Sequence, residues 1–505
     1  MSNARPSAHG GNRKITLITP PYERIARGYE FVKLVTNQAP SLGLLHLAAE
    51  VRRHDYEPRI IESDIFNLSV EQVVEQVVQD RPAYVGITMF TVGVWCAAEI
   101  ARKIRFQLPD TVIIVGGPHI SSMAEETMQR FREFDYAVVG EGEEILINLL
   151  DALQAGEAVD NIPGLVYMRR GEIVDQLHVA PKHPITKDMD RLPMPAWDLL
   201  PDFPRAYRPA LYDYPAGPVA SIAASRGCPF HCKFCDTSTF GAAVRAYSAR
   251  RVFEIMQHLQ EKYGIRHIMF VDDLFTASRK RTTELCELII ESGMQMTWSC
   301  ASRVDVVKPD LLSLMKRAGC WEISFGLESG SNELLQQMDK SADLARSREA
   351  LEWTHRAGIR SKGLFMLGYP GETPETIAAT KAFVRDVPLT IMNLTKFTPY
   401  PGSPIYRDLY GTRIREDHWQ KMNGMNFLWA PEGMTIKDVD REYRAVLRAF
   451  YSQARIPGYY TRFSLRHPTH LLRLINFGRA FLAHKLRQLF GSRHKGFDDR
   501  AVELD

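Results

Sequence analysis

Two separate series of short apolar runs constrain the fold of this chain more than any other feature. Each run is rich in β-branched residues and is separated from the next by a helical pattern, and the series cover residues 15–155 and 219–406. Continuous apolar runs indicate strands buried on both faces, as in parallel sheets covered by helices. With 505 residues, the chain is long enough for both series and a further region. The sequence therefore predicts an α/β protein with two parallel sheets in separate domains.

The first series predicts a doubly wound, Rossmann-like domain of five strands. Its runs are ITLIT (15–19), PRIIES (58–63), AYVGITMF (83–90), TVIIVGG (111–117) and DYAVVG (135–140). Three of them end in turns rich in Gly or Pro, and open α/β sheets bind ligands at the carboxyl ends of their strands. A single glycine turn has a sufficient structural explanation, but three at one edge favour a ligand site. No G-x-G-x-x-G follows the first strand, which argues against a nicotinamide cofactor.

The second series predicts a partial parallel barrel of six βα units. Its runs are VASIAAS (219–225), HIMFVDD (267–273), MTWSCAS (296–302), WEISFGLES (321–329), RSKGLFMLGY (360–369) and LTIMNLTKF (389–397). The intervening residues 156–218 contain a hairpin pattern and a proline-rich stretch, which together indicate a linker. The polar residues 1–14 are expected to be disordered, and residues 407–505 to form a helical C-terminal region. In parallel barrels the reactive groups lie at the carboxyl ends of the strands.

Three cysteines follow the first run of the second series. Cys228, Cys232 and Cys235 have C-x3-C-x2-C spacing on a loop that begins with glycine. Three thiolates in this spacing can bind an iron–sulfur cluster and leave one iron open. The alternative is a zinc knuckle with His231 as the fourth ligand, although zinc sites usually draw paired ligands from two separated places. The other four cysteines have no close spacing and are expected to pack in the interior.

The cysteine loop resembles the signature of the radical S-adenosylmethionine (SAM) enzymes, C-x3-C-x-aromatic-C, with Phe234 at the aromatic position. The resemblance implies a four-iron four-sulfur cluster, with Cys228, Cys232 and Cys235 as its ligands and SAM on the open iron. It also implies an external electron donor such as flavodoxin or ferredoxin, and reductive cleavage of SAM to a 5′-deoxyadenosyl radical. Such a radical is needed to break an unactivated C–H bond, which side-chain acids and bases cannot break.

The ends of the later runs carry polar residues that match the family's SAM contacts. Asp272 and Asp273 stand where the family presents polar groups to the methionine amino group, although adjacent acids after a strand can instead cap the next helix. Ser302 and Arg303 are implied contacts of the methionine carboxylate, and the charge of Arg303 favours it. Glu328 occupies the position of the acid that binds the ribose hydroxyls.

The first domain, with its GGPH and GEGE turns, resembles the cobalamin-binding domain of the cobalamin-dependent branch of this family. The motif D-x-H-x-x-G, whose histidine ligates cobalt from below, is absent, so a domain that has lost cobalamin is an open alternative. His119 is expected either as a cofactor contact or as a helix-start residue. The implied contacts of the cobalamin tail are Thr88, Gly116, Gly117, Gly140, Glu141 and Gly142.

The two resemblances together imply a C-methyltransferase, in which cobalamin carries a methyl group from one SAM to a substrate radical generated with a second. Two alternatives stay open. One is a ring-forming or oxidative enzyme related to the anaerobic tetrapyrrole cyclase, and the other is a non-catalytic sensor that carries the cluster or cobalamin. A small, apolar substrate is expected, but no motif identifies it. The net charge of +3 gives no indication of a nucleic-acid partner.

The C-terminal region ends in a basic segment, residues 461–497, with eight Lys or Arg and no Asp or Glu. Within its helical pattern, one side carries Arg473, Asn476, Arg479 and Arg487, and the opposite side carries Leu474, Phe477, Phe481 and Leu489. Such a helix can lie on an anionic membrane surface; the alternative is a helix docked on the barrel with its basic face in water. The polar N-terminus lacks a secretory signal, so a cytoplasmic location is expected, at the inner face of the membrane where the helix binds lipid.

Overall fold

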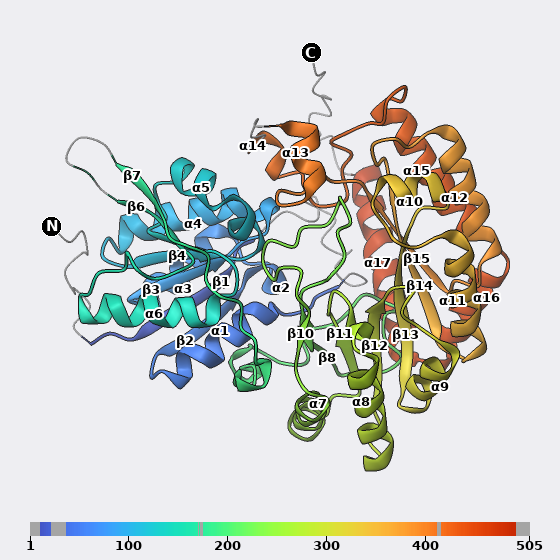
Figure 1. Cartoon of the computed structure of the whole chain (residues 1–505), viewed down its shortest axis with the longest axis horizontal. Helices are drawn as coiled ribbons and strands as arrows, with labels where there is room; N and C mark the ends of the chain where they lie inside the picture. The colour runs from blue at the N-terminus through green and yellow to red at the C-terminus, as the bar shows by residue number, and fades with distance from the viewer. Residues whose placement is uncertain (1–10, 22–36, 170, 172–174, 412–415, 491–505) are drawn as a thin grey trace.

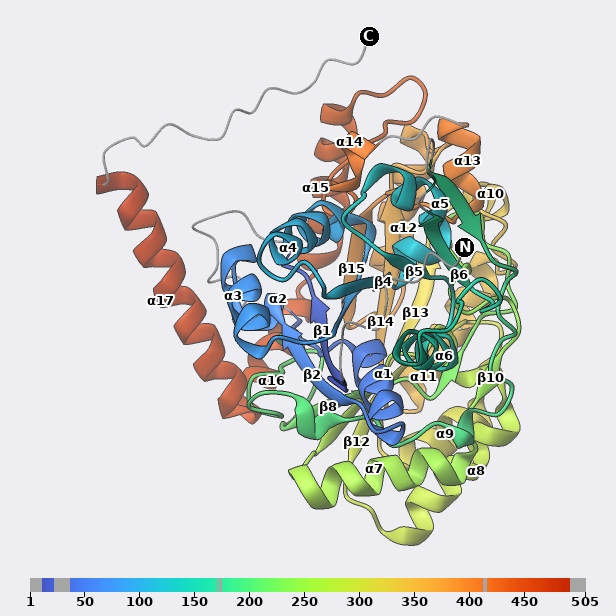
Figure 2. The same cartoon turned by 90° about the vertical axis from the view of Figure 1, so that its left-hand side faces the viewer.

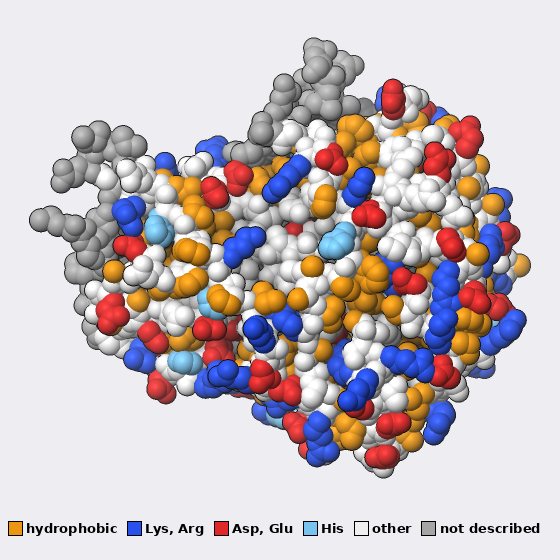
Figure 3. Space-filling model, in the orientation of Figure 1, with side chains coloured by type: hydrophobic (Ala, Val, Ile, Leu, Met, Phe, Trp, Pro, Cys, Tyr) orange, Lys and Arg blue, Asp and Glu red, His pale blue; other side chains and the backbone are white. Residues whose placement is uncertain are grey.

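A computed structural model of the chain describes residues 11–21, 37–169, 171, 175–411 and 416–490. It contains two domains side by side, each built on a mainly parallel sheet, and this arrangement confirms the predicted α/β class (Figure 1). On the face shown in Figure 3, acidic and basic side chains are interspersed. Residues 1–10 lie outside the described part of the chain, and Lys14, expected to be disordered, already belongs to the first strand.

The first sheet has the strand order β2-β1-β3-β4-β5-β6-β7, with β1 to β5 parallel. The strands are β1 (Lys14–Thr19), β2 (Glu57–Glu62), β3 (Tyr84–Thr88), β4 (Val112–Gly116), β5 (Tyr136–Val138), β6 (Leu165–Arg169) and β7 (Gln176–Val179). The helices are α1 (Leu42–Arg53), α2 (Ser63–Phe66), α3 (Val70–Asp80), α4 (Val94–Gln107), α5 (Pro118–Arg130) and α6 (Gly142–Ala155). Helices α1 and α6 pack together on one face, and α3 and α4 on the other. All five predicted runs form strands.

The hairpin that the sequence places in the linker belongs to the first sheet instead. Strand β6 pairs antiparallel with β5, and β7 pairs antiparallel with β6. Leu165 and Val166 of β6 are buried, so the hairpin contributes to the core of the first domain. A hairpin pattern shows that two strands pair with each other but not which sheet they extend, and this is why the sequence alone misplaced it. The first sheet therefore continues to residue 179.

The second sheet curves into a half-barrel with the order β15-β14-β13-β12-β11-β8, all parallel. Its strands are β8 (Val219–Ile222), β11 (His267–Phe270), β12 (Thr297–Ser302), β13 (Cys320–Glu328), β14 (Arg360–Leu367) and β15 (Ile391–Lys396). The helices between them are α7 (Ala249–Tyr263), α8 (Arg279–Ser292), α9 (Pro309–Arg317), α10 (Asn332–Gln337), α11 (Leu344–Arg356) and α12 (Pro374–Asp386). A separate two-stranded ladder, β9 (Ser225–Arg226) and β10 (Arg245–Ala246), follows β8. The six predicted βα units are confirmed.

The two domains share one continuous core. Buried apolar side chains extend without interruption from the first sheet through the linker to the half-barrel. Trp197, Tyr207 and Tyr214 of the linker are buried. At the amino end of β14, Lys362 forms an ion pair with Asp213 of the linker at 2.9 Å. The linker thus packs between the domains rather than hanging free of them.

The C-terminal region consists of helices α13 (Pro404–Tyr410), α14 (Glu416–Trp419), α15 (Ile436–Tyr451), α16 (Arg455–Arg466) and α17 (Pro468–Phe490). Helices α13 and α14 lie over the junction of the two domains, and α15 packs against α12 (Figure 1). The first turns of α17 are docked, because Arg473 donates a hydrogen bond from Nη1 to the Tyr214 hydroxyl at 2.7 Å. The later turns of α17 lie at the outer edge of the molecule in Figure 2, although His484 near the end of the helix is buried. No helix in the described part of the chain is both long and apolar enough to cross a membrane.

Candidate active site

The cysteine loop, residues 227–244, is held between β9 and β10 at the carboxyl side of the half-barrel. It begins with Gly227 in a left-handed conformation, at φ +84°. Two further elements fix its middle. The backbone amide of Lys233 donates to the carbonyl of Met338 after α10 at 3.0 Å, and the amide of Ile405 in α13 donates to the carbonyl of Lys233 at 2.9 Å. The loop is therefore positioned by backbone contacts, which leaves its thiols available for ligands.

The thiols of Cys228, Cys232 and Cys235 lie close enough to act on one another electrostatically. Although Cys235 reaches the surface, the surrounding protein desolvates its thiol and raises the pKa of Cys235 to about 12, and the Asp273 carboxylate and the other two thiols add to the shift. Burial also raises the pKa of Cys232. The protein by itself thus disfavours three thiolates here, whereas bound iron supplies the positive charge that keeps a coordinating thiol deprotonated. The donor set fits a cationic cluster.

A preformed site for a single metal ion is absent from the described residues. In the described ranges, no group of three or more His, Cys, Asp or Glu side chains is gathered so as to hold one metal ion. His231, the fourth ligand of the alternative zinc site, is exposed. Ligands of separate irons in a cluster lie further apart than the ligands of one ion, so three spaced thiols are the expected geometry for a cluster.

The two adjacent acids after β11 have different surroundings. Asp272 is buried and accepts a hydrogen bond from the Ser225 hydroxyl, and burial raises its pKa to about 6. It therefore fixes the start of the cysteine loop from within. Asp273 is exposed and its charge acts on Cys235. Neither acid caps α8, whose N-cap is Ser278, so the helix-cap alternative does not apply.

Ser302 and Arg303, at the end of β12, also differ. The Ser302 hydroxyl is buried and lies 2.6 Å from the hydroxyl of Thr276, so it points into the protein. The Arg303 guanidinium donates two hydrogen bonds to Asp305, at 3.0 and 2.8 Å, and its central carbon lies 3.5 Å from the centre of the Phe230 ring. Arg303 therefore lies against the cysteine loop, as its implied role requires.

Glu328 ends β13 in a strained conformation beside a lysine that the sequence did not indicate. Its φ is +62°, and the register with β14 shifts between Gly326 and Glu328. Such strain in a non-glycine residue is concentrated at functional sites. Its carboxylate accepts a hydrogen bond from Lys340 at 2.7 Å, and the Lys340 ammonium lies 5.9 Å from the centre of the Phe234 ring. No motif marks Lys340, because only the folded chain brings it to this place.

The glycines expected to contact a cofactor tail lie at the carboxyl edge of the first sheet. They are Gly116, Gly117, Gly140 and Gly142. Thr88 pairs with Gly116 across β3 and β4. Gly117 is required by the protein itself, because a Cβ there would lie 2.7 Å from the Thr88 hydroxyl oxygen. At Gly116 and Gly140, a Cβ would make only ordinary van der Waals contacts, at 3.6 and 3.8 Å, so protein packing alone does not require glycine at these two positions.

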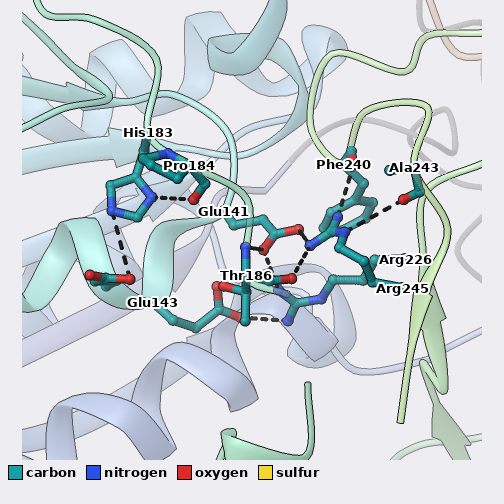
Figure 4. A network of polar contacts seen from close by, with 10 residues as sticks. Glu141, Glu143, His183, Pro184, Thr186, Arg226, Phe240, Ala243 and Arg245 are labelled. Carbon is teal, nitrogen blue, oxygen red and sulfur yellow. Dashed lines mark hydrogen bonds and ion pairs between the residues drawn. The ribbon is translucent and has the colours of Figure 1, made fainter. Parts of the chain in front are cut away.

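Glu141, expected as a tail contact, is turned toward the second domain. It forms ion pairs with Arg245 and, at 3.5 Å, with Arg226, and it accepts a hydrogen bond from the Thr186 amide at 3.2 Å (Figure 4). Glu143, two residues later, pairs with Arg226 at 2.5 Å. The structure thus commits the Glu141 carboxylate to contacts between the domains. The sequence alone does not predict these ion pairs, because the partners of Glu141 lie in the other domain.

His119 is a helix-start residue whose ring faces inward. It follows Pro118 in the first turn of α5, and its two ring nitrogens lie 3.1 and 3.0 Å from the hydroxyls of Thr91 and Thr127. The ring packs edge-on against Trp419 of α14, with centres 4.6 Å apart. Burial lowers the pKa of His119 to about 3, so the ring is neutral. Of the two roles expected for His119, the structure supports the helix start.

We expect this buried neutral histidine to make the protein sensitive to acid. Because its pKa is lowered in the folded state, the unfolded chain binds the proton more readily, and stability is lost as the pH falls below about 6.5. The contribution of His119 is roughly 2 kcal/mol between about pH 6.5 and pH 5. Urea unfolding of wild type and His119→Gln at the two pH values measures it. An equal pH dependence of the two proteins would contradict the assignment.

The structure brings most of the expected SAM-site residues to one side of the half-barrel mouth. The cysteine loop carries the three cysteines and Phe234, and three of the other expected residues lie around it: Asp273, Arg303 and Glu328. Lys340, which no sequence motif marks, joins them. Asp272 and Ser302 lie behind this surface and support it. In the first domain, Thr88, Gly116, Gly117, Gly140 and Gly142 lie at the sheet edge that faces the loop. There a Cβ on Gly140 would lie 3.8 Å from the carbonyl of Thr239.

Comparison with known proteins identifies both domains. Residues 222–384 match the radical SAM superfamily model, and residues 32–150 match the B12 binding domain model. These matches confirm the two resemblances, and with them SAM, a four-iron four-sulfur cluster and cobalamin as the cofactors. Enzymes of this superfamily act on small molecules with the help of an external reductant.

The relatives cover most of the chain. An uncharacterized methyltransferase of Pyrococcus horikoshii is 29% identical over 88% of this chain and 93% of its own length. The anaerobic magnesium-protoporphyrin IX monomethyl ester cyclase of Cereibacter sphaeroides is 26% identical over 78% of this chain and 64% of its own length. Among solved structures, the radical SAM methyltransferase TsrM of Kitasatospora setae, with cobalamin and a [4Fe-4S] cluster bound, has a TM-score of 0.70 at 18% identity. It covers 94% of this chain and 100% of its own, and this likeness confirms the fold.

Proposed function

We propose that this chain, a member of the cobalamin-dependent radical SAM enzymes, transfers a methyl group from SAM to an unactivated carbon of a small molecule. The observation that carries the proposal is the direct apposition of the two cofactor sites. The cysteine loop faces the glycine-rich edge of the first sheet, with the Thr239 carbonyl 3.8 Å from a Cβ built on Gly140. Two of the similar proteins bear methyltransferase names, and this favours methyl transfer over other uses of the same cofactors.

The residues at the barrel mouth have distinct roles in this proposal. Cys228, Cys232 and Cys235 would hold the cluster. With SAM bound, the cluster would supply the chemistry that generates a carbon radical. Asp273, exposed beside the loop, binds the ammonium group of the methionine moiety. Arg303, already oriented by its two hydrogen bonds to Asp305, offers its positive charge to the methionine carboxylate.

Glu328 and Lys340 form the opposite side of the same site. The Glu328 carboxylate, held by Lys340 at 2.7 Å, keeps further acceptor capacity for two ribose hydroxyls. Both side chains are about one-tenth exposed, so water competes poorly for these hydrogen bonds. Cobalamin, bound along the first sheet edge, supplies a methyl carrier. His119 offers it no free ring nitrogen, since both are hydrogen-bonded to hydroxyls.

Isotope transfer tests the proposal. The anaerobically reconstituted protein, loaded with cobalamin and given a strong reductant, is incubated with methyl-labelled SAM and a cell extract of small molecules and lipids. We expect label in an extracted product together with release of 5′-deoxyadenosine. A Cys228→Ala enzyme, treated identically, controls for transfer that does not involve the cluster. Product formation without label transfer would exclude a methyltransferase.

The second candidate is a radical ring-forming or oxidative activity, favoured by the similarity to the anaerobic magnesium-protoporphyrin IX monomethyl ester cyclase. It uses the same cluster and SAM site but leaves the methyl group of SAM unused. The labelling experiment separates the two activities. Release of 5′-deoxyadenosine with an altered but unlabelled product would support the cyclase-type reaction and overturn methyl transfer.

We also propose that α16 and α17 bring the enzyme to an anionic membrane surface, where apolar substrates reside. Part of the basic segment, residues 491–497, lies outside the described chain. Within the described part of the segment, four apolar side chains of α17 are exposed. They are Leu471 (37%), Leu472 (60%), Ile475 (43%) and Leu482 (59%). Helical spacing places them along one side of α17, which lies at the outer edge of the molecule (Figure 2). Exposed Arg479 follows the same helical spacing beside this apolar stripe, where it can reach lipid phosphates.

Vesicle flotation tests the membrane contact. We expect wild type to float with vesicles of phosphatidylcholine and phosphatidylglycerol and to float poorly with phosphatidylcholine alone. The double substitution Leu472→Glu with Ile475→Glu should weaken binding at least about tenfold, because each buried aliphatic side chain contributes about 1.5–3 kcal/mol. Phe106→Glu is the matched control, since Phe106 is 90% exposed on α4. Equal flotation of the two variants would contradict the proposal.

A further inference from the structure

Four buried charged side chains join the two domains beside the cysteine loop, and the proposed reaction uses none of them. They are Glu141 and Glu143 of the first domain and Arg226 and Arg245 of the second, and we call them the interdomain ion pairs (Figure 4). Their side chains are between 4% and 9% exposed. Acidic residues in the first turn of a helix are common, but their burial against arginines of another domain is not explained by the helix alone.

Arg226 is the centre of this group. Its Nη2 lies 2.5 Å from Glu143 Oε1, and its Nη1 lies 3.5 Å from Glu141 Oε2. Glu141 also pairs with Arg245, so two acids balance two arginines. His46 of α1 is buried nearby, and burial together with the Arg226 charge lowers its pKa to about 4, which leaves it neutral. A buried charge is strongly unfavourable without its partner, so these pairs persist only while the domains keep this arrangement.

The ion pairs act on both ends of the cysteine loop. Arg226 lies on β9, directly before Gly227 and Cys228, and Arg245 lies opposite it on β10. Arg245 also donates a hydrogen bond from Nη2 to the carbonyl of Phe240 within the loop, at 2.9 Å. The guanidinium carbon of Arg226 lies 5.4 Å from the centre of the Phe240 ring. The loop is thus held at its start, its end and one point within.

On the other side of the interface, the ion pairs reach the cofactor edge of the first sheet. Glu141 is the N-cap residue of α6 and follows Gly140, an expected contact of the cobalamin tail. Glu143 lies in the first turn of the same helix. The same few residues therefore connect the turn expected to hold cobalamin with the loop expected to hold the cluster.

We propose that Arg226 is a positioning residue that, through Glu143 and Glu141, fixes the cysteine loop against the first sheet and so sets the separation of the two cofactors. A methyl carrier and a radical source that act on one carbon require a fixed mutual geometry, and a small displacement is costly. Arg226 itself touches neither reacting group. The inference rests on the proposed function only for the identity of the two cofactors.

Hydrogen exchange of the cluster-reconstituted protein, measured with and without added cobalamin, tests the mechanical part. In Arg226→Gln, amides of residues 139–146 and 226–247 should exchange at least about tenfold faster, because loss of one partner leaves buried charges unpaired and favours local opening. The matched control is Arg52→Gln. It breaks the ion pair of Arg52 with Asp198 at 2.6 Å, whose side chains are 44% and 41% exposed. Unchanged exchange in Arg226→Gln, or an equal increase in the control, would overturn the proposal.

A spectroscopic measurement tests the effect on the cofactors. The dipolar interaction between cob(II)alamin, which carries one unpaired electron, and the reduced cluster is measured by electron paramagnetic resonance. It should have one value in wild type and a broadened distribution in Arg226→Gln at equal iron content. Arg226→Lys, which keeps the charge, should restore part of the single value. An unchanged distribution in Arg226→Gln would overturn the role in positioning. A wild-type protein that binds no cobalamin would instead count against the proposed function, while the exchange result would still decide the interdomain contact.

A double substitution keeps the test decisive where Arg226→Gln fails to fold. Arg226→Met with Glu143→Met removes both charges of the Arg226–Glu143 pair, and such apolar replacements of buried ion pairs are often neutral for stability. We expect wild-type thermal stability with faster exchange in the cysteine loop. Exchange as slow as in wild type would overturn the proposal, because the loop would then be fixed without Arg226.

Discussion

Substitution of Cys232 by alanine should abolish cluster binding and, with it, all release of 5′-deoxyadenosine. Cys232 is the middle thiol of the three, and burial raises its pKa while the charges of Lys340 and Arg303 lower it. A cluster that loses one of three protein ligands has no comparable donor nearby, since the other cysteines of the half-barrel are buried in its core. Iron and sulfide analysis after anaerobic reconstitution measures the first effect, and chromatography of the SAM products the second.

Cys286→Ala is the matched control for this experiment. Cys286 is fully buried in α8 and contributes only packing, so its replacement should lower stability by about 1 kcal/mol and leave the iron content unchanged. Full iron content in Cys232→Ala would contradict the ligand assignment. The same assay separates the enzyme from a non-catalytic sensor: a wild-type protein that holds the cluster and never cleaves SAM under reducing conditions would support the sensor.

The strands of both sheets could be predicted because each is a continuous apolar run. Strand β4, for example, presents Val112, Ile113, Ile114 and Val115, all buried, as a short continuous apolar run that ends in glycine. The cysteine loop could be predicted for a different reason. Its chemistry is carried by residues close in sequence, so the motif contains the site without any knowledge of the fold.

Residues that act across the fold could not be predicted in this way. Glu143 and Arg226 are 83 positions apart and meet only because the two domains dock. Lys340 meets Glu328 because α10 turns the chain back over the end of β13. No spacing in the sequence specifies either contact. The ion pairs of Glu141 with arginines of the other domain could not be predicted for the same reason. The sequence places Glu141 only among the expected cofactor contacts.

The C-terminal helix shows a further limit of periodicity. The sequence groups Leu474 and Phe477 on the apolar side, and both are indeed partly buried. Leu471, Leu472 and Ile475, however, are exposed. A helical pattern defines faces relative to one another but does not specify which face meets the rest of the protein. Here the docked side includes His470, which is fully buried.

Gly227→Ala should have the second-largest effect, loss of the cluster from an otherwise folded protein. Gly227 precedes the first cysteine at φ +84°, and a Cβ there would lie 2.4 Å from the carbonyl oxygen of Ala243. The left-handed conformation costs about 1–2 kcal/mol for alanine, and the backbone clash adds roughly 1–3 kcal/mol. The clashing atom is the backbone oxygen of Ala243, just before β10, and it cannot rotate away as a side chain would. The loop must therefore move, and Cys228 moves with it.

Gly241→Ala separates the clash from the conformational cost. Gly241 lies in the same loop at φ +72°, but no atom lies within 4 Å of a Cβ built there. The Gly241→Ala protein should therefore lose only about 1–2 kcal/mol of folding stability, the cost of the left-handed conformation for alanine, and keep its iron. Iron content after reconstitution and thermal unfolding of the two variants give the comparison. Equal iron content would mean that the close approach of Gly227 to Ala243 does not position the first cysteine. A loss confined to Gly227→Ala would instead show that the backbone of the loop, and not only its thiols, determines where the cluster is held.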